Sequence, residues 1–211
     1  LSVAPAAGAV VEIAVGGETC RLRVGAGGKP EMEGLAEKEE LDESMARRAV
    51  GALQYLHFLT VGDPGKSDEE FGLTAPDRYV FRTADGFVYT VLLGAPREGG
   101  TRFIRVAVAY ERPVPPPAPA ENAGTEETAP PAAGVSDEAA EKNARRAAEE
   151  QERLAKWTYE ISAWNAESLA MPRAKLVKSP PAPPAEGAAE ETPSEAGAAA
   201  DDAPRAPQDG E

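Results

Sequence analysis

The chain has a single cysteine, Cys20, and a single histidine, His57, among its 211 residues. A disulfide within the chain and a paired-Cys zinc site each need at least two cysteines, and the sequence offers no Cys–His nucleophilic pair with an obvious partner. We expect no metal site. Cys20 shares an alternating pattern with Leu22 and Val24, between polar residues, and is interpreted as a small buried hydrophobe. His57 follows a helical apolar run, which favours a structural role or one at a helix C-terminus.

Sequence motifs of known enzyme classes are also lacking. No GxSxG, HExxH, Walker or dinucleotide-binding pattern occurs. The glycine-rich residues 25–28 are followed by Pro30 and an acidic stretch instead of a helix start, so they are interpreted as a loop. Acid–base chemistry would have to use carboxylates such as Asp77, Asp85 or Glu98, and no spacing recommends them. We therefore expect no enzyme activity, no catalytic residue and no cofactor.

Basic residues and long apolar runs are scarce. The 22 Lys and Arg face 36 Asp and Glu, a net charge of -14, which argues against nucleic-acid binding because that rests on Lys and Arg contacts with phosphates. No apolar run approaches the roughly 20 residues that span a bilayer. Neither a signal peptide nor a span is indicated by residues 1–8.

Two segments combine many prolines with few large apolar residues. Residues 111–135 and 180–211 each hold seven of the 20 prolines, and eight acidic residues face Arg205 alone in the second segment. Such compositions cannot bury enough apolar surface to offset the entropy of ordering. We predict a disordered linker over residues 112–135 and a disordered acidic, solubilising tail over residues 179–211.

The first ordered element is a predicted β-hairpin over residues 10–24. Apolar residues alternate with polar ones on both sides of Gly16-Gly17, as expected for half-buried strands. A two-residue turn at these glycines places Ile13 opposite Cys20 on the buried side. It places Glu12 opposite Arg21 on the solvent side, where an ion pair is worth about 0 to 1 kcal/mol.

Residues 42–59 have the clearest helical pattern. Met45, Ala49, Leu53 and Leu56 form an apolar stripe at helical spacing, and Asp42 or Ser44 is a suitable N-cap. We expect this helix to lie across a sheet. Gly51 within it would cost about 1 kcal/mol relative to alanine, which indicates close backbone packing.

A second hairpin is predicted over residues 79–93, with a loop that contains Gly86. A two-residue loop would place Arg82 on the face of several aromatic side chains. A three-residue loop with Gly86 in the left-handed conformation would pair Thr83 with Phe87 and place every aromatic ring on one face. We prefer the second register, because a slip of one residue moves side chains to the other face.

The remaining pattern predicts a strand over residues 103–110, a solvated Ala- and Glu-rich helix over residues 136–155 with Ser136 at its start, and a closing strand from Trp157 to Ile161. A helical turn over residues 163–169 follows. We therefore predict that residues 1–111 form the main part of the folded domain. Residues 136–178 are expected to pack on this part after the linker. The fold class is α+β, with antiparallel hairpins packed on an amphipathic helix.

One stretch of the chain resembles a family signature. Residues 71–76, the hairpin and the closing segment resemble the DUF4340 domain family of bacterial envelope proteins, in a structural signature that comprises Phe71, Gly72, Leu73, Pro76, Gly86, Gly94, Trp157 and Tyr159. We expect Phe71 and Leu73 to plug the core and Pro76 to set the entry to the strand. The two later glycines are expected to shape the hairpin ends.

The resemblance has implications for function and location. Family members are often encoded beside ABC-transporter genes and gliding-motility-like components, which implies an accessory or scaffold domain with ABC-transporter-associated membrane proteins as partners. It implies the extracytoplasmic side of the inner membrane, with membrane contact only through an anchor that this chain does not contain. The alternative is a small-molecule or glycan-binding domain that uses exposed aromatic residues such as Tyr79, Phe103 or Tyr110.

Overall fold

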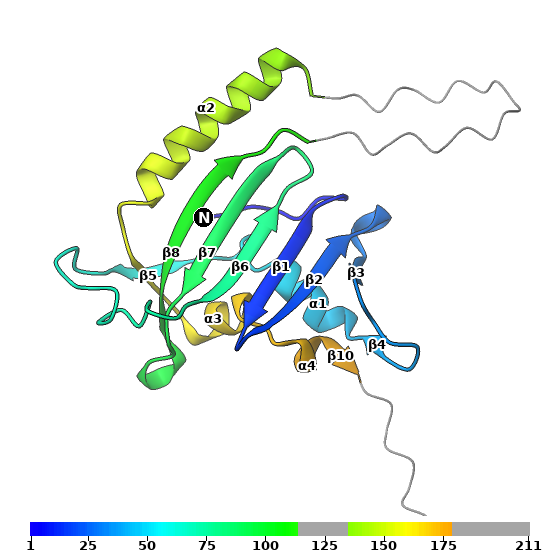
Figure 1. The fold of residues 1–211 in the computed structure, drawn as a ribbon, viewed down its shortest axis with the longest axis horizontal. Coiled ribbons are helices and arrows are strands. Elements are labelled where there is room, and N and C mark those ends of the chain that lie inside the picture. The colour runs from blue at the N-terminus through cyan, green and yellow to red at the C-terminus, as the bar shows by residue number, and fades with distance from the viewer. Residues whose placement is uncertain (114–134, 179–211) are drawn as a thin grey trace, which may run out of the picture. The chain divides into compact units, whose positions relative to one another are not determined.

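The computed structural model describes residues 1–113 and 135–178 (Figure 1). The predicted linker and acidic tail lie outside the described residues, apart from the two ends of the linker. The described chain is a mixed structure with one large antiparallel sheet and a few helices, so the α+β prediction is confirmed at this level.

The large sheet has eight strands in the order β3-β2-β1-β6-β7-β8-β9-β5, and each neighbouring pair is antiparallel. The strands are β1 (Val10–Val15), β2 (Glu18–Val24), β3 (Pro30–Met32), β5 (Phe58–Val61), β6 (Asp77–Arg82), β7 (Phe87–Leu93), β8 (Arg102–Tyr110) and β9 (Tyr159–Ile161). Two further strands, β4 (Glu40–Leu41) and β10 (Val177–Lys178), pair with each other. The edges of the large sheet are therefore β3 and β5.

The first hairpin has the predicted register. Ile13 lies opposite Cys20, and Glu12 lies opposite Arg21, across a turn at two positive-φ glycines. The Arg21 guanidinium forms its ion pair with Glu33, however, at 3.5 Å. Glu33 directly follows β3. The ion pair therefore links β2 to the end of β3 and does not link the two strands of the hairpin.

The second hairpin also has the predicted register. Phe81 lies opposite Tyr89, and Tyr79 lies opposite Val91. The Thr83 N–H donates to the Phe87 carbonyl at 2.8 Å, which closes the three-residue loop. Because the register is this one, all the aromatic rings of the hairpin are buried on one face of the sheet.

The predicted helix over residues 42–59 is wrong beyond its first half. Asp42 is the N-cap of α1 (Glu43–Val50), but the helix ends at Gly51, whose N–H bonds to the Arg47 carbonyl at 2.9 Å. The chain then turns, and residues 58–61 form β5 against β9. The helical spacing of apolar residues continues past Gly51 because Leu53 and Leu56 are both buried. They are buried by a turn and an irregular segment, however, and not by a helix.

The loss of the last helical turns also changes the role of His57. It lies in the segment between α1 and β5 and is exposed. The predicted position at a helix C-terminus is therefore wrong.

The helix α2 (Asp137–Leu154) begins at the predicted Ser136, whose hydroxyl accepts from the Ala139 N–H at 3.3 Å. It lies along β8 (Figure 1). Strand β9 pairs only with residues 102–104 of β8, and beyond them the Gln151 side chain accepts from the Val108 N–H. The helix therefore covers a strand edge that would otherwise be open.

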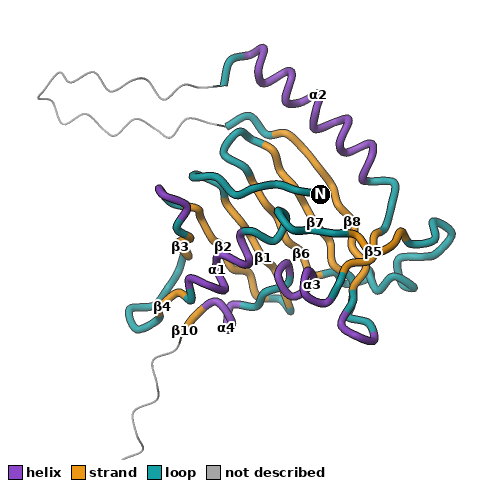
Figure 2. Tube along the Cα trace, turned by 180° about the vertical axis from the view of Figure 1, so that it is seen from behind, coloured by secondary structure: helices purple, strands orange, loops and turns teal. Residues whose placement is uncertain are grey.

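Two short helices and the main core complete the fold. Helices α3 (Ala163–Leu169) and α4 (Arg173–Leu176) lie beside α1 over one face of the sheet (Figure 2). The turn predicted over residues 163–169 is thus α3. The core between this helical layer and the sheet includes the largest fully buried side chains, among them Tyr79, Phe81, Ile104, Ile161, Leu169 and Leu176.

Candidate interaction surface

The signature residues Phe71 and Leu73 are buried, but not in the main core. They pack with Phe103 in a separate cluster, and the Phe71 and Phe103 rings meet edge to face at 4.8 Å between centroids. Ile104, the next residue of β8, lies in the main core. Since successive strand residues point to opposite faces, the second cluster covers part of the sheet face that the helices leave open.

Three signature glycines lie where the backbone leaves little freedom for a side chain. Gly72 and Gly86 have positive φ, at 70° and 97°. A Cβ atom on Gly94 would lie 2.4 Å from the Phe71 carbonyl oxygen. These positions require glycine because the backbone is left-handed or because another backbone is in contact. Pro76 directly precedes β6, as predicted.

The closing segment is only partly as predicted. Tyr159 is buried and its ring stacks on Phe58, with centroids 4.1 Å apart. Trp157 does not share that side of a strand, because its N–H bonds to the Leu154 carbonyl at 3.2 Å and places it in the turn after α2. Its side chain is 42% exposed.

The carboxylates considered for acid–base chemistry do not form one site. Asp77 stands at the start of β6 in an ion pair with Arg102 at 2.6 Å. Asp85 lies in the loop beyond the other end of that strand, where Thr83 donates to it. Glu98 belongs to a separate 3₁₀ turn. In residues 1–113 and 135–178, no group of three or more His, Cys, Asp or Glu could hold a metal ion.

The aromatic residues suggested for ligand binding are not exposed as expected. Tyr79 is fully buried, and its hydroxyl donates to the Ala49 carbonyl at 3.0 Å. Phe103 is buried in the second cluster. Tyr110 is half-buried, and its ring packs edge to face on Phe87 at 5.8 Å. Cys20 is buried as predicted, and this burial raises the pKa of its thiol.

Five large hydrophobic side chains of the described residues are exposed. They come from residues 55–61 and 157–164, two segments that the pairing of β5 with β9 brings together. We call these side chains the β5 edge patch; they are between 42% and 59% exposed and comprise Tyr55, Leu59, Val61, Trp157 and Trp164.

The patch lies along a sheet edge that no described strand covers. Strand β5 has neither a charged residue nor a proline, the features that usually protect an edge. The opposite edge, β3, starts with Pro30 and continues with Glu31. A register shift between Phe58 and Thr60 leaves Leu59 without a partner on β9, and its side chain is the most exposed of the patch.

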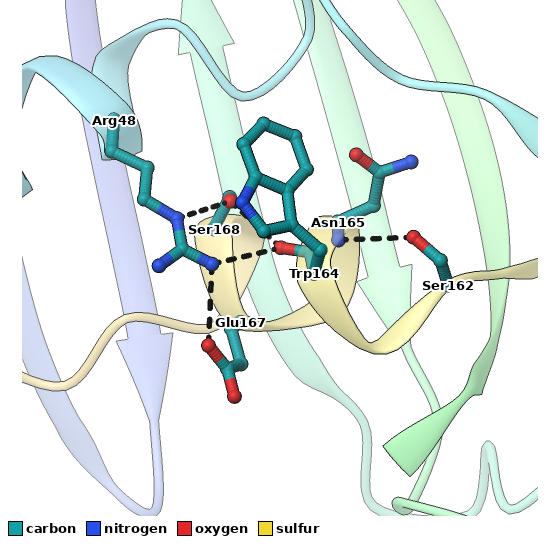
Figure 3. A network of polar contacts seen from close by, with 6 residues as sticks. All are labelled: Arg48, Ser162, Trp164, Asn165, Glu167 and Ser168. Atoms are coloured by element: carbon teal, nitrogen blue, oxygen red, sulfur yellow. Dashed lines mark hydrogen bonds and ion pairs between the residues drawn. The ribbon is translucent and has the colours of Figure 1, made fainter. Parts of the chain in front are cut away.

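Trp164 is held in place although half of its surface is exposed (Figure 3). The Arg48 guanidinium lies over the indole, 5.2 Å from the ring centroid. It also donates to the Ser168 hydroxyl at 2.9 Å, to the Trp164 carbonyl at 3.1 Å and to the Glu167 carboxylate at 3.2 Å. These bonds join α1 to α3 and fix the exposed ring before any partner binds.

The segment before β5 is fixed by the same helix. The side-chain amide of Asn165 is buried and bonds to the backbone of residues 55–57 in either of its two orientations. The N-cap of α3 is Ser162, whose hydroxyl accepts from the Asn165 N–H at 3.3 Å (Figure 3). The Tyr55 and Trp164 end of the patch is therefore a rigid surface.

The hollows of the described residues give little support for a cofactor site. Hollows of about 450 and 460 Å³ are lined by α2 side chains alone. A smaller one of about 190 Å³ lies beside Trp157, with Lys66 and Arg105 in its wall. This smaller hollow is below the range of about 300 to 1,000 Å³ that sites for drug-sized ligands usually enclose.

Comparison of the chain with protein-family models, curated proteins and solved structures finds no match. The resemblance to the DUF4340 family therefore stays a prediction. Within the described residues, no helix is both long enough and apolar enough to cross a membrane. The sequence reasoning missed the β5 edge patch, although the run Phe58-Leu59-Thr60-Val61 carries the β-branched and aromatic composition of a strand.

Proposed function

We propose that this chain is a non-catalytic accessory or scaffold domain of a bacterial envelope complex of the ABC-transport or gliding-motility type, on the extracytoplasmic side of the inner membrane. The observation that carries the proposal is the β5 edge patch, where the exposed large hydrophobic side chains of the described residues line one free edge. The resemblance of the signature residues to the DUF4340 family supplies the cellular setting.

The energetics of the patch favour a protein contact. Aromatic side chains bury roughly 150 to 250 Å² each, so three that are half exposed leave roughly 300 Å² of aromatic surface in water. Such an area is in the range of the largest patch on a typical monomer, which is often functional. Trp and Tyr are the residues that most often dominate protein interfaces, and Arg48 holds Trp164 ready for one.

The test is recovery of partners from the bacterium that encodes the chain. A tagged chain would be crosslinked in cells and purified, and ABC-type ATPases and permeases would be quantified by mass spectrometry. We expect such a component with the wild type. Leu59→Lys should reduce its recovery about tenfold or more, as expected for a hot-spot contact of about 2 kcal/mol.

Thr19→Lys is the matched control, because Thr19 is an exposed strand residue outside the patch and the substitution introduces the same charge. Its recovery of partners should equal that of the wild type. Equal losses in both variants, or the absence of any transport or gliding component from the wild-type sample, would contradict the proposed function.

A small-molecule or glycan-binding function is the second candidate. The observation in its favour is the 190 Å³ hollow beside Trp157, whose wall combines that indole with Lys66 and Arg105. A sugar acid or a similar small anion would be its ligand class. A metabolite panel should then raise the melting temperature of the wild type but not of Trp157→Ala, and a panel without effect on the wild type would remove this candidate.

A further inference from the structure

The hollow beside Trp157 has a positively charged wall. Among the described residues that line it, Lys66, Arg105 and Lys156 are basic and none is an Asp or a Glu. The whole chain has a net charge of -14, so this wall is opposite in sign to the molecule that surrounds it. A concave site with such a wall attracts anions and repels cations.

The three basic side chains come from three separate segments. Lys66 belongs to the loop after β5, Arg105 to β8, and Lys156 to the turn after α2. Lys156 forms an exposed ion pair with Glu152, one helical turn earlier, at 3.2 Å. Because the two other basic groups approach from the loop and from the sheet, an anion in the hollow would bridge these two parts of the fold.

The Arg105 guanidinium is the most firmly held of these groups. Its Nε–H donates to the Thr158 hydroxyl at 3.1 Å, and Thr158 is only 7% exposed. The guanidinium also forms an ion pair with the Asp68 carboxylate, whose side chain is 58% exposed. The strand and the buried hydroxyl therefore fix the guanidinium, and the exposed carboxylate is the partner that can leave it.

The loop that carries Asp68 does not depend on this ion pair. The backbone holds it, because the Asp68 carbonyl accepts from the Leu73 N–H at 2.7 Å, and because Phe71 and Leu73 are buried in the second cluster. Exposed ion pairs contribute little to stability. A ligand can therefore replace the Asp68 carboxylate on Arg105 without unfolding the loop.

Resting on the small-molecule-binding candidate above, we propose that the ligand is a sugar carboxylic acid whose carboxylate replaces Asp68 on Arg105. Asp68 shows which group fits, because its own carboxylate occupies the guanidinium in the free protein and the planar fork of Arg matches a carboxylate. The exposed Trp157 indole presents a flat apolar surface to the sugar ring. Asp68 is thus an internal competitor that weakens binding.

The test is calorimetric titration of the purified full chain with sodium glucuronate and sodium galacturonate. Glucose has a similar ring without the acid group, and glucose 6-phosphate carries a phosphate instead. The wild type should bind at least one uronate. It should bind glucose about tenfold or more weakly, because a hydrogen bond to a charged group is lost, and it should also bind glucose 6-phosphate more weakly than the uronate.

Variants assign the roles of the charged residues. Asp68→Asn removes the competitor and should bind the uronate about two- to fivefold more tightly, the range expected for an exposed ion pair. Glu69→Gln is the matched control, because it removes the same charge from the exposed next position of the loop, and it should bind like the wild type. Arg105→Gln and Lys66→Gln should both bind more weakly, and circular dichroism would verify that they fold.

The possible failures are distinguishable. Equal affinities of Asp68→Asn and Glu69→Gln would overturn the role of Asp68 as a competitor. Binding of glucose 6-phosphate but of neither uronate would overturn the carboxylate while leaving a small-anion site. Uronate binding that neither Arg105→Gln nor Lys66→Gln weakens would overturn the assigned hollow. A wild type that binds neither uronate overturns the ligand class, whereas a metabolite panel without any effect removes the small-molecule function itself.

Discussion

At the residue scale, the signature positions act on the backbone. Gly94 lies where β7 has just ended, directly against the chain at Phe71 and Gly72, and the Ala95 N–H donates to the Gly72 carbonyl at 2.9 Å. This contact lets residues 71–73 reach the sheet and bury Phe71 beside Phe103. Most residues that resemble a family signature therefore specify the fold, whereas Trp157 is the signature residue whose large side chain is exposed.

Gly94→Ala should destabilise the protein by about 1 to 3 kcal/mol, the usual cost of overpacking, since the added methyl group would meet the Phe71 carbonyl oxygen. Urea unfolding would measure the change. Gly65→Ala is the control: its nearest neighbour would be the Asp63 carboxylate at 3.3 Å, and this side chain can move. Equal effects in the two variants would refute the close approach.

Alkaline pH should destabilise the protein through its buried tyrosines. Burial raises the pKa of the Tyr89 hydroxyl to about 12, and the Glu150 carboxylate adds to the increase. Burial also raises the pKa of Tyr79. An unfolded tyrosine has a pKa of about 10, so this stabilisation is complete below about pH 10 and is lost as the pH rises toward about 12.

Tyr89→Phe should therefore lose less stability than the wild type on going from about pH 9 to about pH 11.5. Urea midpoints at the two pH values give the comparison. The substitution leaves Tyr79 in place, so part of the pH dependence should remain. An identical loss in both proteins would show that Tyr89 does not contribute.

At the scale of elements, α2 depends on its contact with β8. Only Ala147 and Leu154 of its 18 residues are buried, and the Tyr89 hydroxyl donates to Glu150 at 3.3 Å. In proteins, most of the stability of a helix comes from packing of its amphipathic face. The sheet therefore keeps the helix formed, and the helix in return protects the β8 edge.

Ala147→Asp should detach α2, because it places a carboxylate without a partner at a position only 2% exposed. We expect a loss of several kcal/mol in unfolding free energy or loss of the helix itself, seen as weaker circular dichroism and faster amide exchange over residues 137–154. Ala148→Asp, at the exposed next position, should change stability by less than about 0.5 kcal/mol. Comparable effects of the two would contradict this packing.

At the scale of the whole molecule, charge and apolar surface are separated. The net charge of -14 opposes self-association, whereas the β5 edge patch has no charged residue on its strand. Because salt screens repulsion between exposed charges, the free energy of unfolding should increase between about 0.05 and about 0.5 M salt. Urea midpoints at the two salt concentrations measure this, and a lower midpoint at high salt would mean that attractive ion pairs outweigh the repulsion.

The sequence alone determined the parts of the fold that rest on local chemistry. Alternation predicted both hairpin registers, together with the Gly16-Gly17 turn in the first and Gly86 in the second, and Ser136 predicted the start of α2. Each of these follows from side-chain period, turn geometry or capping within a short stretch.

Only the tertiary structure decided what depends on partners distant in the sequence. Residues 58–61 form a strand and not the end of a helix because β9, about 100 residues later, pairs with them. The same pairing brings the segments that carry Trp157 and Trp164 to the two ends of β5, and the helical layer buries Tyr79. Periodicity identifies which residues are apolar, but which apolar residues stay exposed depends on the elements that cover them.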